Sequence, residues 1–401
     1  MNQRRLRNTP FSAESILLTG ASGYVGGLIA AVLLVDTNVR VIMPVRPGKE
    51  TRLRERLSLE LAARGHSIEE YQNRILVYEW PSAEPGRNDL SNWSRTLDHL
   101  QIEEIVHCAG CLDYFDELAL STVNEELTSR LLEVGTLWNV RRFTYISTAY
   151  AGGYLDEPIA EAPAPEPTAD PTYYTRSKRN AEWLVIHSKL PWVILRPSIL
   201  IGEYANGRYS GKRYGLYQQW MGLERLLTNK YHEEIHTVAP PQPLNLIHQD
   251  VFQHSFLSAW RWLPPGAICH LVSRDQACPS MRELWDLWLS VVQPHRVYYY
   301  RNFNDVNLKA IDIRQRAYLT FAQVNLEIAA HRWCFERGWL ELLEAKGLRF
   351  HDATLESVAR CQDRFVASSD LLARYIQKYQ DKFPTHIEFM EEPSNVLDQA
   401  T

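Results

Sequence analysis

Residues 16–36 have the sequence ILLTGASGYVGGLIAAVLLVD. A short apolar strand, Ile16 to Leu18, runs directly into a turn whose glycines follow the pattern G-x-x-G-x-x-G from Gly20 to Gly26. Because glycine has no Cβ atom, such a turn can bend sharply and bring backbone N–H groups close to a pyrophosphate. Tyr24 to Asp36 is apolar nearly all round and predicts a buried helix, whose positive dipole end adds to the anion site.

The strand before this turn and the helix after it are the context that a dinucleotide-binding turn requires. A tight turn with a purely structural role is the alternative interpretation. The residues of the turn that we expect to bind the dinucleotide are Thr19, Gly20, Ser22, Gly23, Tyr24, Val25 and Gly26.

Strand-like and helix-like segments alternate through the rest of the first half of the chain. The segments expected to be strands are 39–45, 74–80, 105–108, 143–146 and 192–200, and those expected to be helices are 52–64, 90–100, 116–135 and 173–188. Strands separated by helices favour βαβ units in a parallel sheet with helices on both faces. The predicted fold class is therefore α/β, a doubly wound parallel sheet of the Rossmann type.

The alternating pattern ends after Gly202. A Pro-rich loop at 160–171 interrupts it, and the sequence PPQP at 240–243 marks a second break. The last part of the chain is mainly helical in pattern and rich in aromatic residues, which favour a helical core over an apolar tunnel for an acyl chain or ring. The expected division is an N-terminal tail (1–14), a dinucleotide-binding domain (15–202 plus 244–275) and a mainly helical substrate-binding cap (203–243 plus 276–401).

Composition excludes several classes of protein. Of the 401 residues, 45% are hydrophobic and 23% are charged, which excludes a disordered, collagen-like or coiled-coil chain. The formal net charge is -5, so no basic balance indicates a nucleic-acid partner. The 6 cysteines are too few for a disulfide scaffold, and a reducing compartment fits best.

Targeting and membrane signals are weak. The first residues, MNQRRLR, have no apolar stretch behind them and do not form a secretory signal. The longest apolar run, Leu28 to Val35, is far shorter than the roughly 20 residues that span a bilayer. We therefore expect a cytoplasmic protein. Peripheral membrane contact stays open through the amphipathic stretch from Trp333 to Leu348.

The residues after the second expected strand bear on cofactor choice. A site that prefers NAD usually has Asp or Glu here, to bind the ribose hydroxyls. This chain offers Arg46 and Lys49 instead. A guanidinium suits a 2′-phosphate, so the sequence predicts NADPH, with a solvated basic loop as the alternative.

Tyr174 and Lys178 have the spacing Y-x-x-x-K, which puts both side chains on one face of a helix. The phenol would donate a proton in carbonyl reduction. Its free pKa is about 10, and a neighbouring ammonium would lower that pKa. A hydroxyl at the end of the preceding strand could bind the substrate carbonyl. We expect Thr148 in this role and Ser147 as the alternative, although either could simply cap the strand end.

Together, the Gly-rich turn, Ser147-Thr148 and Tyr174/Lys178 resemble the extended short-chain dehydrogenase/reductase superfamily. Further strings narrow the resemblance to fatty acyl reductases and thioester reductase domains. These strings are Val106-His107-Cys108-Ala109-Gly110, Asp113, Phe115-Asp116, Asn124, Ser147-Thr148-Ala149-Tyr150, Tyr174-Thr175-Arg176-Ser177-Lys178 with Ala181-Glu182, Leu195-Arg196-Pro197-Ser198-Ile199, Gly202, Gly207 and Leu244-Asn245-Leu246-Ile247 with Asp250. The resemblance covers residues 15–275.

This resemblance implies an NADPH-dependent reductase whose leading substrate is an acyl thioester, CoA-linked or carrier-bound, reduced to an aldehyde or alcohol. The further residues that it implies at the cofactor are Cys108, Ala109, Gly110, Asn124, Lys178, Pro197, Ser198 and Ile199. We expect no attached adenylation or carrier domain, so that a carrier-bound substrate would have to arrive on another protein. Gly202 to Gly215 is more similar to bacterial thioester reductases, because the Pro-Gly-Trp of eukaryotic fatty acyl reductases is absent.

Two other functions are compatible with parts of this pattern. A ketone, quinone or heteroaromatic reductase of a secondary-metabolite pathway would use the same three residues without releasing a thiol. A non-catalytic NADPH-binding sensor would not need them.

Other polar residues carry weaker signals. Cys108 and Cys111 form an isolated C-x-x-C pair, for which packing is the favoured interpretation, and we expect no metal site. We expect His107 to line the cofactor side, and Asp113 and Glu203 are candidate pocket carboxylates.

Overall fold

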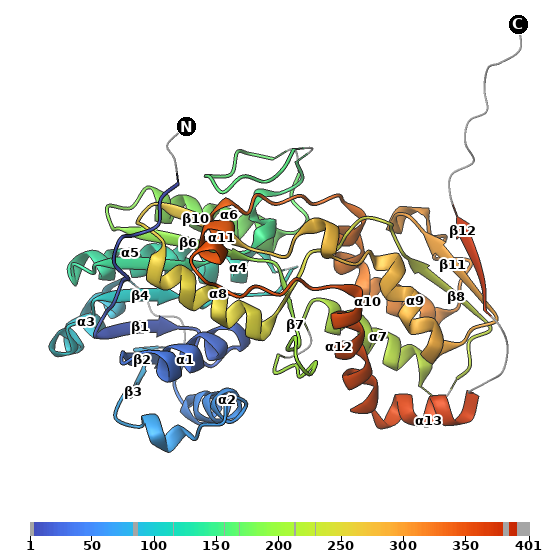
Figure 1. Ribbon diagram of the computed structural model, residues 1–401, viewed down its shortest axis with the longest axis horizontal. Coiled ribbons are helices and arrows are strands. Elements are labelled where there is room, and N and C mark those ends of the chain that lie inside the picture. Colours follow the sequence, from blue (N-terminus) through green and yellow to red (C-terminus); the bar gives the residue numbers. More distant parts are fainter. Residues whose placement is uncertain are drawn as a thin grey trace, which may run out of the picture.

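The computed structural model describes residues 4–82, 87–114, 116–155, 157–167, 169–211, 214–228, 230–379 and 385–390. Its larger body is built on a seven-stranded sheet in which every pairing is parallel, in the order β10-β6-β5-β4-β1-β2-β3 (Figure 1). The strands are β1 (Ser15–Thr19), β2 (Arg40–Val45), β3 (Ile75–Glu79), β4 (Glu104–His107), β5 (Arg142–Ile146), β6 (Trp192–Pro197) and β10 (Ala267–Leu271). Chain order reverses between β1 and β4, which is where ligands bind in open parallel sheets.

Helices cover both faces of this sheet, because successive apolar residues of its buried strands point to opposite sides. Leu18 packs in the core under α1 (Tyr24–Asp36) and α8 (Gln249–Trp262), whereas its neighbour Leu17 packs in the core on the other face. The remaining helices of this body are α2 (Glu50–Ala62), α3 (Arg87–Thr96), α4 (Glu117–Leu120), α5 (Leu127–Leu137), α6 (Tyr173–Ile186) and α11 (Gly338–Ala345). The doubly wound α/β fold predicted from the sequence is therefore confirmed.

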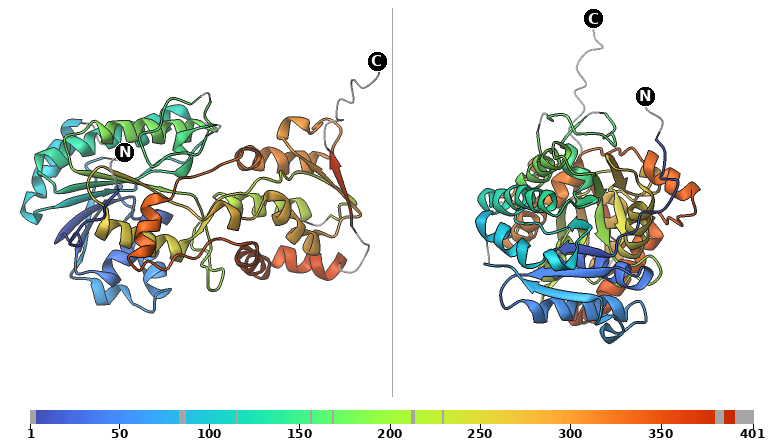
Figure 2. Two further views of the ribbon diagram at one scale, coloured as in Figure 1. Left: turned by 45° about the horizontal axis from the view of Figure 1, so that its top comes forward. Right: turned by 90° about the vertical axis from the view of Figure 1, so that its left-hand side faces the viewer.

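A smaller body at the other end of the elongated molecule has its own apolar core (Figure 2). Its helices are α7 (Leu216–Leu227), α9 (Met281–Val292), α10 (Ile313–Ala330), α12 (Leu355–Ala367) and α13 (Asp370–Tyr379). The same body contains a three-stranded parallel sheet of β8 (Glu234–Val238), β11 (Arg296–Tyr300) and β12 (His386–Met390), which was not expected from the sequence. Most of the aromatic side chains in the last part of the chain are buried, as expected for a core, but Phe321 is exposed.

The two bodies are joined by a short parallel pair, β7 (Ile199–Ile201) with β9 (Leu246–His248). In addition, α11 returns from the far end of the chain and packs against β10 and α8. We propose the same division into two domains as the sequence suggested, with α11 assigned by its packing to the larger one.

The stretch from Trp333 to Leu348 does not present an apolar face to a membrane. Trp333, Trp339, Leu340 and Leu343 are buried within the protein, because the amphipathic pattern of this stretch faces the core. These buried side chains therefore give no support to the membrane contact considered for this stretch. Within the described ranges, no helix combines the length and apolarity needed to cross a bilayer.

Candidate active site

The Gly-rich turn after β1 is so tightly packed that side chains cannot replace Gly20 or Gly26. Gly20 has a φ of +77°, in the left-handed region, and a Cβ there would lie 2.7 Å from the backbone nitrogen of Ala109. A Cβ on Gly26 would overlap the carbonyl of Gly20. Gly23 donates its N–H to the Gly20 oxygen at 2.8 Å and precedes α1 without a capping side chain. The first N–H groups of α1 therefore stay available to an anion.

Thr19 and His107, at the ends of β1 and β4, begin a chain of hydrogen bonds that fixes this turn. The Thr19 hydroxyl accepts from the N–H groups of Cys108 and Ala109, each at 3.2 Å, and meets Nδ1 of His107 at 2.7 Å. Nε2 of His107 meets the Thr128 hydroxyl at 2.9 Å, and that hydroxyl donates to the carbonyl of Asn124 at 2.6 Å. The only consistent assignment is a neutral imidazole that accepts at Nδ1 and donates from Nε2.

The His107 side chain therefore links Thr19 to Thr128 inside the protein and does not line the cofactor surface as expected. It is fully buried, and burial lowers its pKa to about 3, with the Lys178 charge adding to the effect. The Thr19 hydroxyl is likewise occupied within the protein and holds the end of β4 against the Gly-rich turn.

Asn124 joins the loop after β4 to the helix that carries Tyr174. It lies in a π-helical segment, Ser121–Glu126, within the stretch that the sequence predicted as one continuous helix. Its side chain accepts from the N–H of Cys111 at 2.8 Å and donates to the Ser177 hydroxyl at 2.8 Å. A Cβ on Gly110 would lie 3.2 Å from its Oδ1. The wider turn of a π-helix is a frequent feature of functional sites.

Tyr174 and Lys178 lie one turn apart near the start of α6, which Thr172 caps with its side chain. Lys178 is buried, donates from Nζ to the carbonyl of Ile146 at 2.7 Å, and lies 4.2 Å from the Tyr145 ring centroid. It therefore reaches the end of β5, where Ser147 and Thr148 follow. Burial lowers the pKa of Lys178 to about 8, against the opposing influence of Cys108.

The phenol of Tyr174 differs electrostatically from the expectation. Burial raises its pKa above the ordinary value, and the neighbouring Tyr114, Cys108 and Cys111 raise it further. This is opposite in direction to the lowering by Lys178 that the sequence led us to expect. The Tyr114 ring, 5.9 Å from the Tyr174 ring and nearly perpendicular to it, is a neighbour that no sequence pattern indicated.

Three hydroxyls at the carboxyl edge of the sheet have no hydrogen bond, or only a long one, to the described residues. The hydroxyls of Ser147 and Ser198 are buried without a hydrogen-bond partner within the described chain. Thr148 accepts only a long bond, 3.4 Å, from the N–H of Tyr150. Because buried hydroxyls are normally paired, these three hydroxyls are suited to a polar ligand at this edge.

The end of β2 has the free cations that the sequence predicted. Arg46 and Lys49 are exposed, and among the described residues neither side chain has a hydrogen bond or ion pair. The adjacent Gly48 donates its N–H to Glu79 at 2.8 Å.

The remaining candidates differ in their position and exposure. Cys108 is a protonated thiol, because burial raises its pKa to about 12. Pro197 ends β6, Ile199 begins β7 and is half-buried, and Asp113 is exposed. Phe115 lies outside the described residues, and the described part of the chain contains no cluster of three or more metal-ligating side chains.

The match to known protein families comes from the sequence region that builds this edge. The family model described as "Male sterility protein", an NAD-binding family, matches residues 18–252, which is more than half of the chain. The chain belongs to this family. All the residues of the Gly-rich turn from Thr19 onward, and the pair Tyr174/Lys178, lie within the matched region.

Two curated proteins that are similar in sequence to this chain are matched over very different shares of their own length. The chain is 27% identical over 210 residues to "Peramine synthetase ppzA" of Metarhizium rileyi, a match that covers 49% of this chain but 7% of that protein. It is 25% identical over 239 residues to "Putative fatty acyl-CoA reductase CG8306" of Drosophila melanogaster, covering 48% of this chain and 45% of that protein. The chain thus matches less than half the length of either relative.

Solved structures share the fold of this family member. The terminal R domain from the myxalamid PKS-NRPS biosynthetic pathway has a TM-score of 0.70 at 20% identity, and the match covers 89% of this chain and 91% of that chain. A thiolation-reductase di-domain from an archaeal non-ribosomal peptide synthetase has a TM-score of 0.63 at 17% identity, with 92% of each chain covered.

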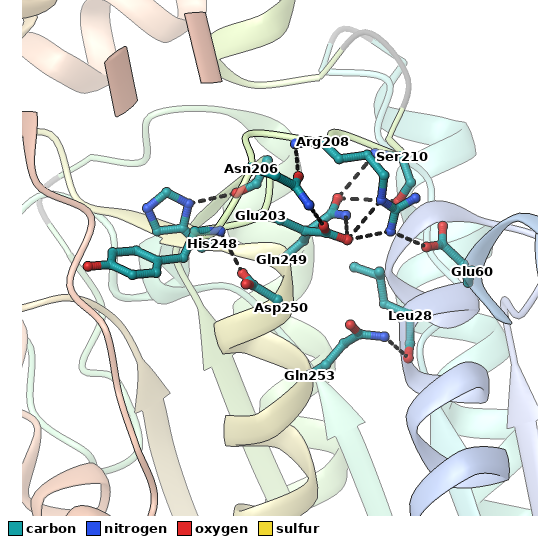
Figure 3. A network of polar contacts seen from close by, with 12 residues as sticks. Leu28, Glu60, Glu203, Asn206, Arg208, Ser210, His248, Gln249, Asp250 and Gln253 are labelled. Atoms are coloured by element: carbon teal, nitrogen blue, oxygen red, sulfur yellow. Dashed lines mark hydrogen bonds and ion pairs between the residues drawn. The ribbon is translucent and has the colours of Figure 1, made fainter. Parts of the chain in front are cut away.

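Glu203 is not a pocket carboxylate as considered. With Arg208 and Glu60 it forms a cluster of charged side chains between the two bodies, called the clasp below. Glu203 accepts from Arg208, whose guanidinium also approaches the buried carboxylate of Glu60 at 3.6 Å (Figure 3). Gln249 accepts from the Tyr24 hydroxyl at 3.0 Å and from the N–H of Ser210 at 3.1 Å. The segment that follows β7, residues 202–211, is called the linker below. It is therefore anchored to α1, α2 and α8, beside the Gly-rich turn.

Proposed function

We propose that this protein is an NADPH-dependent reductase that transfers a hydride to the carbonyl of an acyl thioester, giving an aldehyde or alcohol. The observation that carries the proposal is that Tyr174, Lys178, the unpartnered hydroxyl of Ser147 and the weakly bonded hydroxyl of Thr148 belong to the same carboxyl edge as the Gly-rich turn. Membership of an NAD-binding family supports the cofactor class.

The residues present fit a nicotinamide dinucleotide. The uncapped N-terminus of α1, directly after the Gly-rich turn, supplies N–H groups for a pyrophosphate. The orphaned hydroxyl of Ser198, together with the neighbouring Pro197 and Ile199, suits a carboxamide. When bound, the reduced cofactor would supply the hydride.

The protein's own groups would handle the substrate oxygen and its proton. Tyr174 holds its proton, since its pKa is raised, and would deliver that proton to the carbonyl oxygen as negative charge develops there. Thr148 would donate a hydrogen bond to the same oxygen. Lys178, as an ammonium, would bind a ribose hydroxyl and stabilise the phenolate after the proton has left.

The thioester assignment is supported by the relatives. The fly relative is described as a putative fatty acyl-CoA reductase, and the myxalamid structure as a terminal R domain of a PKS-NRPS pathway. A thiolation-reductase di-domain of similar fold makes an acyl carrier protein a reasonable source of substrate, in addition to CoA thioesters. The six cysteines are free thiols, which supports the cytoplasm as the place of action.

The test is NADPH oxidation with a panel of acyl-CoA and carrier-bound thioesters, with the released thiol measured in parallel. We expect one NADPH to be oxidised per thiol released if the product is the aldehyde, and two per thiol if the aldehyde is reduced further to the alcohol. Tyr174→Phe should lower kcat by a factor of at least about 10² while NADPH binding changes little. NADPH loss without thiol, on ketones or quinones, would favour the other reductase class. No oxidation with any substrate would favour a binding-only protein.

The choice of NADPH over NADH has a separate test. Arg46→Ala should weaken NADPH binding about tenfold or more and leave NADH binding nearly unchanged, since a guanidinium at the end of β2 suits the 2′-phosphate. Titration of each cofactor by fluorescence gives both affinities. An equal loss for both would show that Arg46 does not bind the phosphate.

A further inference from the structure

A cavity with a volume of about 710 Å³ lies between the linker after β7, α7 and α12. None of the residues proposed above for catalysis or cofactor binding lines it. Its size is within the range of small-molecule sites, which are mainly apolar with a few well-placed polar groups.

Aromatic and apolar side chains form the walls of this cavity. The rings of Tyr209, from the linker, and Tyr217, from α7, are stacked with centroids 3.7 Å apart and planes 3° apart. The Phe365 ring of α12 meets Tyr217 at 6.1 Å in an edge-on arrangement. Met221 follows Tyr217 by one helical turn and lines the same space. The lining thus suits an apolar chain or ring.

Two glycines of the linker line the cavity and allow close packing around it. Gly207 has a φ of +68°, and a Cβ there would lie 2.5 Å from the carbonyl oxygen of Arg360 on α12. A Cβ on Gly211 would overlap the ring of Tyr209. Only glycine allows the linker to approach α12 this closely and Tyr209 to keep its stacked position. The cavity is therefore preformed.

Two arginines at the cavity differ in how their charges are used. Arg208 is paired with Glu203 and approaches Glu60, so its charge is neutralised within the clasp (Figure 3). Arg364 of α12 is exposed and, among the described residues, has no side-chain hydrogen bond or ion pair. A free guanidinium beside an apolar cavity is complementary to a carboxylate or phosphate attached to an apolar body.

We propose that this cavity binds an amphipathic anion, with its apolar chain or ring against Tyr217, Met221 and Phe365 and its carboxylate or phosphate on Arg364. The site is separate from the proposed catalytic edge. It is nevertheless adjacent to the Gly-rich turn, because the Tyr209 ring also contacts the Tyr24 ring at 5.1 Å.

The proposal is tested by calorimetric titration of the full chain, without cofactor, with dodecanoate, dodecyl phosphate and the neutral dodecanol. We expect saturable binding of at least one anion with one site per chain, and the stronger of the two anions identifies the preferred head group. Dodecanol should bind about tenfold more weakly or not at all.

Two variants and a control locate the binding. Arg364→Gln should weaken the anion about tenfold, and Met221→Trp should abolish binding by filling the apolar space. Arg349→Gln removes another exposed arginine, one that does not line the cavity, and should change nothing. Thermal unfolding checks that each variant is folded. If neither anion binds, if dodecanol binds equally well, or if Arg364→Gln binds like Arg349→Gln, the proposal is overturned. Since no cofactor or thioester is used, this result is independent of the proposed reductase activity.

Discussion

At the scale of single residues, burial determines the protonation of the titratable side chains at the candidate active site. The pKa of His107 is lowered to about 3 and that of Lys178 to about 8, while that of Tyr174 is raised. The sequence identified Tyr174 and Lys178 because their spacing is a local property. It could not give the direction of these pKa changes, since burial depends on the packing of distant segments.

The charge of Lys178 predicts an alkaline limit to activity. The ammonium is the form that can bind a ribose hydroxyl and stabilise a phenolate, and its pKa is about 8. We therefore expect kcat/KM to fall about tenfold per pH unit above this value, as for any essential acid of the free enzyme. Lys178→Arg keeps its charge and should shift the fall to higher pH. A flat profile up to about pH 9.5 would contradict the assignment.

The neutral form of His107 predicts acid sensitivity of the fold. Its pKa is near 6.5 in an unfolded chain and about 3 in the folded one, so the unfolded state binds more protons between these values. Its full contribution to stability is present above about pH 6.5 and is lost as the pH falls toward 3, by at most about 1.4 kcal/mol per pH unit. Unfolding of His107→Gln in urea should show a shallower dependence on pH. Imidazole nitrogen NMR shifts assigned to His107 that show it titrating near pH 6.5 in the folded protein would refute this.

At the scale of elements, the first strand, turn and helix were predictable because they are local and carry a strong pattern. The helix expected over Tyr24–Asp36 has these bounds in the structure. The stretch 116–135 was predicted as one helix, and the π-helical segment within it was not foreseen. This π-helical segment is associated with tertiary contacts, the hydrogen bonds of Asn124 with Cys111 and Ser177, and residue periodicity does not reveal such contacts.

Comparing Gly20 with Gly65, which lies outside the Gly-rich turn, distinguishes the cost of backbone strain from the cost of a steric clash. Gly20 and Gly65 have φ of +77° and +79°. A Cβ on Gly20 would collide with the backbone of Cys108 and Ala109, whereas a Cβ on Gly65 would meet no other atom within 4 Å. Gly65→Ala should cost about 1 kcal/mol of unfolding free energy and keep NADPH binding. Gly20→Ala should cost more and abolish that binding.

Urea unfolding and cofactor titration of both glycine variants give the comparison. Equal effects of Gly20→Ala and Gly65→Ala on NADPH affinity would mean that the turn does not hold the dinucleotide.

At the scale of the whole molecule, the larger body followed from the sequence and the smaller one only in part. The alternation of strands and helices predicts the doubly wound sheet, because each βαβ unit is contiguous in the chain. The small sheet pairs segments around residues 236, 298 and 388 that are far apart in sequence, and nothing local indicates that they meet. Likewise, the clasp of Glu60 with Arg208 joins α2 to the linker and could not be inferred from either segment alone.

The central claim is that one phenol, one amine and one hydroxyl meet at the reactive end of a bound dinucleotide. A crystal structure of the protein with NADP⁺ tests this most directly. The account predicts the pyrophosphate on the turn from Gly20 to Gly26, the Lys178 ammonium on a ribose hydroxyl, and the oxygens of Tyr174 and Thr148 together beside the nicotinamide. A nicotinamide bound away from Tyr174, or a cofactor that avoids the Gly-rich turn, would contradict it.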